Sequence, residues 1–207
     1  MTLEQAYGIG APTCRREDDR LLRGAGSYSD DFNLADQLFA VMVRSPHAHA
    51  RINRLDAVAA RGVTGVHAVL TGADYSADDI GDIGHKANPA GAVDWKKPAF
   101  VNRDGSVPFD RPQPTIVRDK VRHVGEIVAV VVAETEAIAV NAADLVEVVY
   151  DPLPVVTDAI AALEDNAPDV WSDCPGNVTL DAEMGDADAT DKVFAGAAYV
   201  VTARFFN

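Results

Sequence analysis

The histidines are the side chains with the clearest potential for chemistry, because imidazole binds metals and transfers protons near neutral pH. His47 and His49 are two residues apart, so in an extended segment their side chains would share one face, as two ligands of a metal site can. No third ligand follows at a convincing spacing, and Arg44 and Arg51 on either side disfavour a bound cation. We therefore interpret the pair as surface or hydrogen-bonded histidines.

His123 is the more interesting histidine, because it stands next to Val124-Gly125-Glu126 and directly precedes the most apolar run of the chain. A structural role at the entrance of a strand still outweighs a catalytic one at this position. His67 falls within a predicted strand and His85 within a predicted loop, and neither has a partner pattern that indicates catalysis.

Two glycine motifs resemble a dinucleotide fingerprint, and both are incomplete. Gly24–Ser29 ends in serine and Gly8–Thr13 ends in threonine where the third glycine belongs. A strand–helix pair, which the motif requires, flanks neither of them. Both are better interpreted as turns. The interpretation of the chain as a nucleotide-binding domain therefore depends only on these incomplete motifs.

Acidic pairs and cysteines complete the candidates for chemistry. Asp30-Asp31 and Asp78-Asp79 are adjacent in sequence, so they would face opposite ways in a strand and are interpreted as solvated turns. Cys14 and Cys174 lie far apart without a CxxC pair, which suits a reducing compartment. The sequence therefore assigns no catalytic, cofactor-binding or metal-binding residue.

The elements that would position these side chains are organised around residues 118–163. Ile127–Ala133 is a run of β-branched residues typical of a strand buried on both faces. A helix is expected to begin at Glu134 and Thr135, with Thr135 as N-cap, since apolar residues follow at helical spacing on one face: Ile138, Ala142, Leu145 and Val146. A second strand, Val146–Tyr150, ends before Pro152 and Pro154.

Upstream, the pattern predicts a strand over 36–45, apolar on both alternating sets and so buried on both sides. A second strand is predicted over Ala50–Leu55, and Asp56 would then cap a short helix that Gly62 closes at its C-terminal end. A third strand is predicted over Val66–Leu70. The order before the middle of the chain is therefore strand, strand, helix, strand.

The long segment 75–115 is rich in glycine and proline and shows no sustained period, so we interpret it as a functional or interface-forming loop. Trp95, Phe100 and Phe109 indicate that it is pinned rather than disordered, as a loop that wraps over another domain or subunit would be. Further on, the sequence predicts short helices over 158–163 and 190–198 and a strand over 199–206 with an exposed apolar edge that favours self-association.

Composition limits the class of partner. The 207 residues carry a net charge of −14, from 18 basic and 32 acidic residues, so phosphate backbones and anionic lipid are poor partners. Arg15-Arg16 is followed by Glu17-Asp18-Asp19 where an export signal needs an apolar run, and no stretch approaches the length of a membrane span. We expect no nucleic acid or membrane partner and a cytoplasmic location.

Long blocks of the chain closely resemble the molybdenum-containing hydroxylases, which are the xanthine dehydrogenase, aldehyde oxidase and aerobic carbon monoxide dehydrogenase large chains. The blocks read RREDDRLLRGAGSYSDDFNLADQLFAVMVRSPHAHARI, GVHAVLTGADY, VRHVGEIVAVVVAET…AADLVEVVYDPLPVVTDAIAAL and CPGNVTLDAEMGDADATDKVFAGAAYVVTARFFN. They follow one another in the family's order and cover the chain from about Gly8 to Asn207, most weakly between Ser76 and Pro112.

The resemblance implies an α+β fold of the α/β-hammerhead type, a mixed β-sheet with flanking helices and a long ordered loop. The implied division is an N-terminal extended arm over 1–35, a hammerhead domain over 36–163 with its loop at 75–115, and a linker with the truncated start of a molybdopterin-binding domain over 164–207. The family's glutamate base and pterin contacts belong to later domains, and no position here matches them.

By the same resemblance, the chain is the N-terminal part of the molybdopterin-binding subunit of an oxidoreductase, scaffolding the catalytic domains without being catalytic alone. The full enzyme would carry a molybdopterin-type molybdenum cofactor, with [2Fe–2S] clusters and FAD on partner domains or subunits in a hetero-oligomer, and none of them on this segment. The alternative is a noncatalytic scaffold or assembly module that acts as a separate chain, in which case no polypeptide carrying molybdenum domains would accompany it.

Overall fold

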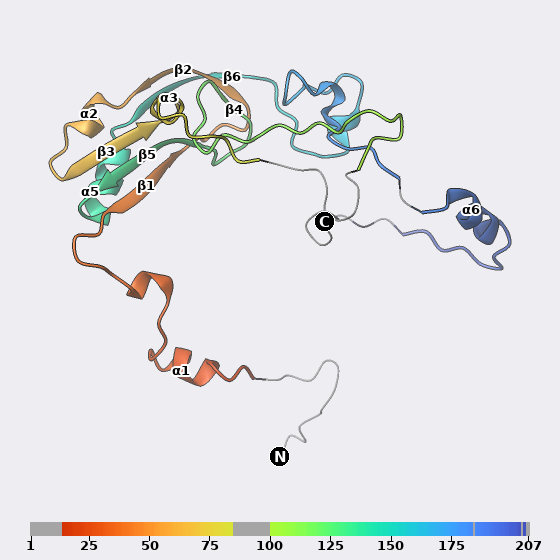
Figure 1. The fold of residues 1–207 in the computed structure, drawn as a ribbon, viewed down its shortest axis with the longest axis horizontal. Coiled ribbons are helices and arrows are strands. Elements are labelled where there is room, and N and C mark those ends of the chain that lie inside the picture. The colour runs from red at the N-terminus through yellow and green to blue at the C-terminus, as the bar shows by residue number, and fades with distance from the viewer. Residues whose placement is uncertain (1–13, 85–99, 184, 204, 206–207) are drawn as a thin grey trace.

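The computed structural model describes residues 14–84, 100–183, 185–203 and 205, and their strands form two small sheets (Figure 1). The first has the order β1-β5-β3, with bounds Phe39–Arg44, Ile127–Ala133 and Val66–Thr71. The second has the order β4-β2-β6, with bounds Lys120–Val121, Ala50–Asp56 and Glu147–Pro152. The α+β hammerhead class is confirmed, but the expected single mixed sheet is two three-stranded sheets whose described pairings are antiparallel.

Strand β5 lies at the centre of the first sheet, as its run of valines predicts. Val128, Val131 and Ala133 have no exposed surface, and the strand pairs with β1 on one side and β3 on the other. The predicted second strand of this unit, now β6, belongs to the other sheet, where it pairs with β2 through Pro152. The chain therefore crosses from one sheet to the other between β5 and β6.

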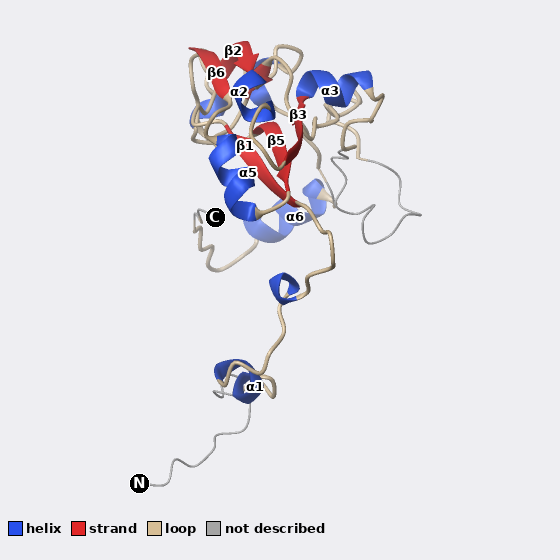
Figure 2. Cartoon of the chain, turned by 90° about the vertical axis from the view of Figure 1, so that its left-hand side faces the viewer, coloured by secondary structure: helices blue, strands red, loops and turns tan. Residues whose placement is uncertain are grey.

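Helix α5, Glu136–Ala143, covers one face of the β1-β5-β3 sheet (Figure 2). Thr135 is its N-cap, as predicted, because its side-chain oxygen accepts a hydrogen bond from the Ile138 amide at 3.2 Å. The buried positions are the alanines Ala139 and Ala142, which let the helix approach the strands closely. Leu145 was expected on this face, but it follows the end of the helix and is 44% exposed.

Two short helices flank β3. Asp56 was predicted to cap the short helix α2, Val58–Arg61, but the N-cap is Ala57, and the Asp56 carboxylate accepts from the Val58 amide one residue further on. Gly62 closes the helix as its C-cap, as predicted, with a φ of −81° that is not left-handed. Helix α3, Gly72–Ala77, begins directly after β3 with Thr71 and Asp74 bonded reciprocally in a capping box.

Strand β1 corrects the expectation that residues 36–45 are buried on both sides. Its burial alternates, with Phe39, Val41 and Val43 facing the core and the intervening residues exposed. Met42 is 44% exposed although it lies in the middle of the strand. The reason is tertiary, since α5 covers only one face of this sheet and the described residues leave the other face open.

A second core joins the two sheets. Val128 of β5 packs with Ala50 of β2 and Val121 of β4, and Val117 completes this buried group. Hydrogen bonds from Val117 to the carbonyl of Ile127 and from Ser45 to the carbonyl of Glu126 hold the connecting segments against β5. The hammerhead part therefore has two apolar clusters that share β5.

The described part of the long segment 75–115 is pinned, as its aromatic residues predict. A bridge joins Ile83 and Gln113, and residues 100–111 run beside residues 169–181. Arg103 pairs with Asp181 at 2.8 Å, and the Phe109 ring lies 6.1 Å from that of Trp171. Trp95 and His85 lie outside the described residues.

The ends of the described chain extend away from the sheets (Figure 1). The arm expected to be irregular contains α1, Asp18–Leu22, and a 3-10 turn, Ser29–Asp31. Short 3-10 turns also occupy Ala161–Leu163, within the helix predicted over 158–163, and Pro175–Asn177. Helix α6, Ala187–Ala195, begins three residues earlier than predicted, because Asp186 caps it, and it has no buried residue.

The strand predicted over 199–206 is wrong for the described residues in that range, which have no regular structure. An extended strand needs a neighbour to hydrogen-bond with, and the described chain offers none at this position. Tyr199, Val201 and Phe205 are 92%, 91% and 88% exposed, so the apolar surface expected here is present. Within the part of the chain that is described, none of the helices has the length and apolar character of a membrane span.

Candidate functional site

The most organised polar cluster of the described chain surrounds Arg122, between β4 and β5. The Arg122 guanidinium lies over the Trp171 ring, 3.7 Å from its centroid, in cation–π geometry. Its Nη1 donates to the carbonyl of Lys120 at 3.2 Å, while its Nε is buried without a hydrogen-bond partner. Trp171 therefore supplies the main contact of this cation.

Glu126 is the buried acid of the same cluster, with 6% of its surface exposed. Its carboxylate accepts a hydrogen bond from the Arg122 amide and lies 3.7 Å from Nδ1 of His123. The turn that carries it depends on Gly125, whose φ of +87° is a left-handed conformation that other residues rarely adopt. Arg44 of β1 closes the turn by donating to the Gly125 carbonyl at 2.8 Å.

A cavity of about 300 Å³ opens beside this cluster. Arg111 lies 5.5 Å from the centroid of the Trp171 ring and pairs with Asp173. Phe109 lines the same cavity and packs against Trp171. Two arginines and two aromatic rings thus join the loop at 100–113 and the segment at 169–181 to the hammerhead sheets.

Burial dominates the electrostatics of the cluster. It lowers the pKa of Arg122 below its usual range, because the cation loses water, while Glu126 and Asp119 oppose this shift. An arginine remains protonated near neutral pH even so, which makes it a fixed cation and a poor proton carrier. A guanidinium stacked on a flat indole, with carboxylates nearby but none of the described ones paired with it, is the environment of a structural arginine.

His47 and His49 have different surroundings and make different contacts. His49 is buried, and its Nδ1 is 2.8 Å from the carbonyl oxygen of Pro154, so Nδ1 carries the proton and donates it. His47 packs against the Tyr150 ring with 4.8 Å between centroids. Burial raises the pKa of Tyr150, which keeps its hydroxyl protonated. Both histidines are hydrogen-bonded or packed, as the sequence predicts.

The other candidates from the sequence are dispersed. His67 lies on β3 with its Nε2 3.5 Å from Glu134, and His123 is a half-exposed residue at the strand entrance. Asp31 caps the backbone amide of Tyr28 in a turn. Asp78 and Asp79 are exposed after α3. Apart from His123, which lies beside Glu126 in the Arg122 cluster, these positions carry local structure and do not converge on one site.

The cysteines and the glycine motif are also separate from the cluster. Cys14 is exposed and Cys174 is buried, and both are free thiols. Burial raises the pKa of Cys174, so its thiol is held in the unreactive protonated form. Gly24 has a φ of +70°, as expected for a turn. Among the described residues, no three His, Cys, Asp or Glu side chains gather closely enough to hold a metal.

Sequence reasoning missed the contact between Arg122 and Trp171. The two residues are far apart in the chain, and neither periodicity nor a local motif links them. The proximity of Arg122 to Glu126 was the one local signal, since a carboxylate four residues from an arginine suggests a pair. The geometry assembles a cation, an acid and two aromatic rings without a nucleophile–base pair, and its chemical capacity is to hold segments together.

Comparison with known proteins gives one family model and many relatives. The model described as "Aldehyde oxidase and xanthine dehydrogenase, a/b hammerhead domain" matches residues 23–93 and 90–154. The carbon monoxide dehydrogenase large chain of Afipia carboxidovorans is 34% identical over 95% of this chain and 23% of its own length. The nicotine 6-hydroxylase large subunit of Paenarthrobacter nicotinovorans is 35% identical over 95% of this chain and 22% of its own length.

Solved structures agree with these relatives. Reconstituted CO dehydrogenase from Oligotropha carboxidovorans has a TM-score of 0.64 and 34% identity, over 93% of this chain and 23% of that one. Quinoline 2-oxidoreductase from Pseudomonas putida 86 has a TM-score of 0.58 and 40% identity, over 75% of this chain and 18% of that one. The chain therefore spans only about a quarter, or less, of the length of these proteins.

Proposed function

Because the chain belongs to the a/b hammerhead domain family of aldehyde oxidases and xanthine dehydrogenases, we propose that it forms the hammerhead part of the molybdopterin-binding large subunit of a molybdenum hydroxylase-type oxidoreductase. The family match over residues 23–154 carries this proposal. Relatives about four times longer than the matched part, all oxidoreductase subunits by name, support it further. The role we assign to the chain is to scaffold the catalytic domains, without catalysing the reaction alone.

We assign three regions within the chain. Residues 1–35 form an N-terminal arm, residues 36–163 the hammerhead domain with its loop at 75–115, and residues 164–207 a linker and the beginning of a molybdopterin-binding domain. The separation of α6 from the two sheets supports the last boundary, because this helix has no buried residue. The contact between residues 100–111 and 169–181 supports the assignment of the loop, because it packs against the segment that we assign as the linker.

The molybdenum cofactor of the full enzyme would supply an oxygen nucleophile and accept the substrate's reducing equivalents. The described side chains do not fit such a group. Arg111 and Arg122, the cations of the candidate site, are engaged by Asp173 and Trp171, and no three metal-ligating side chains gather among the residues that are described. We therefore place the cofactor in other domains and derive no catalytic step from this chain.

The partners follow from the same proposal. The remaining molybdopterin-binding domains would pack against this part, and [2Fe–2S] and FAD domains or subunits would carry electrons away in a hetero-oligomer. A net charge of −14 supports the absence of nucleic acid and anionic membrane partners. A cytoplasmic location suits an enzyme of this class with two free cysteines.

The experiment is to purify the assembly that contains this chain, measure its subunit masses, and determine molybdenum by elemental analysis. We expect molybdenum and pterin to be retained by polypeptide that includes the remaining large-subunit domains, and to be lost when residues 1–207 are isolated. Stoichiometric pterin on the isolated chain would contradict the domain assignment. A stable assembly without molybdenum would support the alternative, a noncatalytic scaffold that works as a separate chain.

A further inference from the structure

The face of the β1-β5-β3 sheet opposite α5 is apolar across all three strands. In antiparallel pairs, directly opposed residues point to the same face. The pairing of Met42 and Leu70 with Val130, and of Ala40 and Ala68 with Val132, places six apolar side chains on this face. We call this set the outer face: Ala40, Met42, Ala68, Leu70, Val130 and Val132.

The outer face is open to water in the described chain. Met42 and Leu70 are 44% and 40% exposed, and Val130 and Val132 are only partly buried although they belong to the central strand. On the covered face, by contrast, Val131 beside them has no exposed surface. Apolar area left in water forgoes about 25 cal/mol per Å² of stabilisation, so a contiguous patch of this kind marks a contact surface.

Polar residues border the outer face. Arg44, the last residue of β1, and Glu134, the residue after β5, are both exposed and lie at opposite ends of the strands that carry the outer face. A desolvated apolar centre with a charged border is the usual composition of a protein–protein interface.

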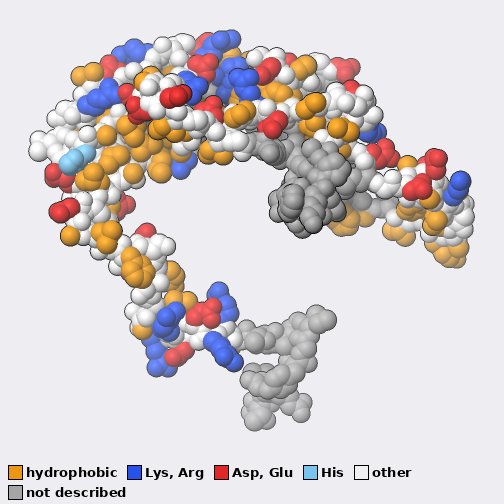
Figure 3. Space-filling view, in the orientation of Figure 1, with side chains coloured by type: hydrophobic (Ala, Val, Ile, Leu, Met, Phe, Trp, Pro, Cys, Tyr) orange, Lys and Arg blue, Asp and Glu red, His pale blue; other side chains and the backbone are white. Residues whose placement is uncertain are grey.

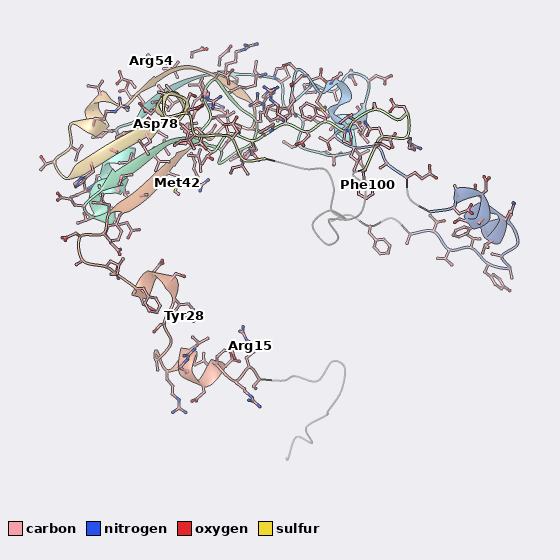
Figure 4. The ribbon with its side chains drawn as sticks, in the orientation of Figure 1. Arg15, Tyr28, Met42, Arg54, Asp78 and Phe100 are labelled. Atoms are coloured by element: carbon pink, nitrogen blue, oxygen red, sulfur yellow. The ribbon has the colours of Figure 1, made fainter. Side chains whose placement is uncertain are left out.

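The N-terminal arm leads into β1, the edge strand that carries Ala40 and Met42. Figure 4 labels Met42 at this strand, and Figure 3 shows hydrophobic side chains gathered over this part of the molecule. The arm also carries exposed apolar residues, with Leu22 86%, Phe32 73% and Leu34 80% exposed. Exposed apolar surface is therefore present both on the arm and on the outer face.

We propose that the outer face contacts the remaining, molybdopterin-binding part of the large subunit, and that this part contributes apolar, uncharged side chains to the contact. This inference rests on the proposed function and assigns the contact surface. The relatives support this occupant, because the matched part is 22–24% of their length, so a body about three times larger accompanies it. A second copy fits less well, since two chains of net charge −14 repel each other.

The test is site-specific photo-crosslinking in the complete assembly. A photoreactive amino acid replaces Met42 in one variant and Val149 in a control. Val149 is equally exposed, at 44%, but it lies on β6 of the other sheet, opposite Arg54 and between Glu147 and Asp151 in the strand. Mass spectrometry of the crosslinked peptides identifies what each position touches.

We expect crosslinks from position 42 to peptides of the molybdopterin-binding domains and few or none from position 149. Crosslinks from position 42 to a second copy of this chain, to an iron–sulfur or FAD polypeptide, or to nothing would overturn the inference. In a parallel measurement, Met42→Glu should weaken the retention of the molybdopterin-binding part by about tenfold or more, because the contact would bury a carboxylate, and Val149→Glu should not.

Circular dichroism of the free chain distinguishes a lost contact from a lost fold. The retention result counts only if the Met42→Glu chain keeps the wild-type spectrum. If it does not, Leu70→Glu is used as the second variant. If the outer-face variant, Met42→Glu or Leu70→Glu, retains the molybdopterin-binding part as well as Val149→Glu does, the surface assignment is refuted and the proposed function stands. If the wild-type assembly itself lacks molybdopterin-binding polypeptide, the proposed function fails instead.

Discussion

Replacing Gly72 with alanine is expected to destabilise the hammerhead part, because the glycine lies where two backbone segments touch. Gly72 is the first residue of α3 and is buried. A Cβ atom at this position would stand 2.4 Å from the carbonyl oxygen of Val117, 2.8 Å from its carbonyl carbon and 2.9 Å from the Cα of Arg118. All three are backbone atoms, so no side-chain rotation can relieve the clash.

The size of the effect follows from what must move. An ordinary carbon–oxygen contact of about 3.2 Å requires a shift of roughly 0.8 Å between α3 and residues 117–118, in a close-packed interior. Val117 is 2% exposed and donates to the carbonyl of Ile127 at 2.9 Å, so the shift strains that bond to β5. Overpacking costs about 1–3 kcal/mol and a weakened hydrogen bond about 1 kcal/mol, against a gain of up to about 1 kcal/mol in helix propensity. We expect a net loss of about 1–3 kcal/mol.

Urea unfolding followed by far-ultraviolet circular dichroism measures this loss in the full chain. Gly81→Ala is the matched control, since nothing lies within 4 Å of a Cβ built there and its φ is not left-handed. That variant should unfold within about 0.5 kcal/mol of the wild type. Equal midpoints for Gly72→Ala and Gly81→Ala would refute the reasoning that backbone contact fixes glycine at position 72.

Three further changes test other parts of the structure. Thr135→Ala removes the N-cap of α5 and should cost about 1 kcal/mol in urea unfolding, whereas Thr135→Ser should cost little. The hydrogen bond from Thr71 lowers the pKa of Asp74 in the folded protein below 3.8. The ionised carboxylate therefore stabilises the fold fully above this pH, and the stabilisation is lost as the pH falls through the lowered pKa of the folded protein. In Asp74→Asn this part of the acid-dependent loss of stability should disappear. Trp171→Ala uncovers Arg122 and should speed trypsin cleavage there, a result that Trp171→Phe should largely prevent.

Local patterns predicted the elements whose signals lie in neighbouring residues. The valine run gave β5, because β-branched side chains favour an extended backbone whatever they pack against. Thr135 marked the start of α5, because its hydroxyl bonds an amide only three residues away. Histidines 47 and 49 were interpreted as surface or hydrogen-bonded, and His49 does donate to the carbonyl of Pro154.

Expectations that needed a distant partner were the ones that failed. The strand over 199–206 has the right alternation but no neighbour to pair with among the described residues. Strand β1 has apolar residues on both alternating sets, yet its covering helix lies on one face only. The Arg122–Trp171 contact joins segments that no local period connects.

The sequence by itself determined the central strand β5, the N-cap of α5 and the family, because each depends on residue types within a few positions or on long blocks in a fixed order. Tertiary structure alone decided that the strands divide into two sheets, that Arg122 rests on Trp171, and that the described residues leave the outer face exposed. The physical reason is that pairing and burial are properties of surfaces brought together from distant parts of the chain, and residue order does not state which surfaces meet.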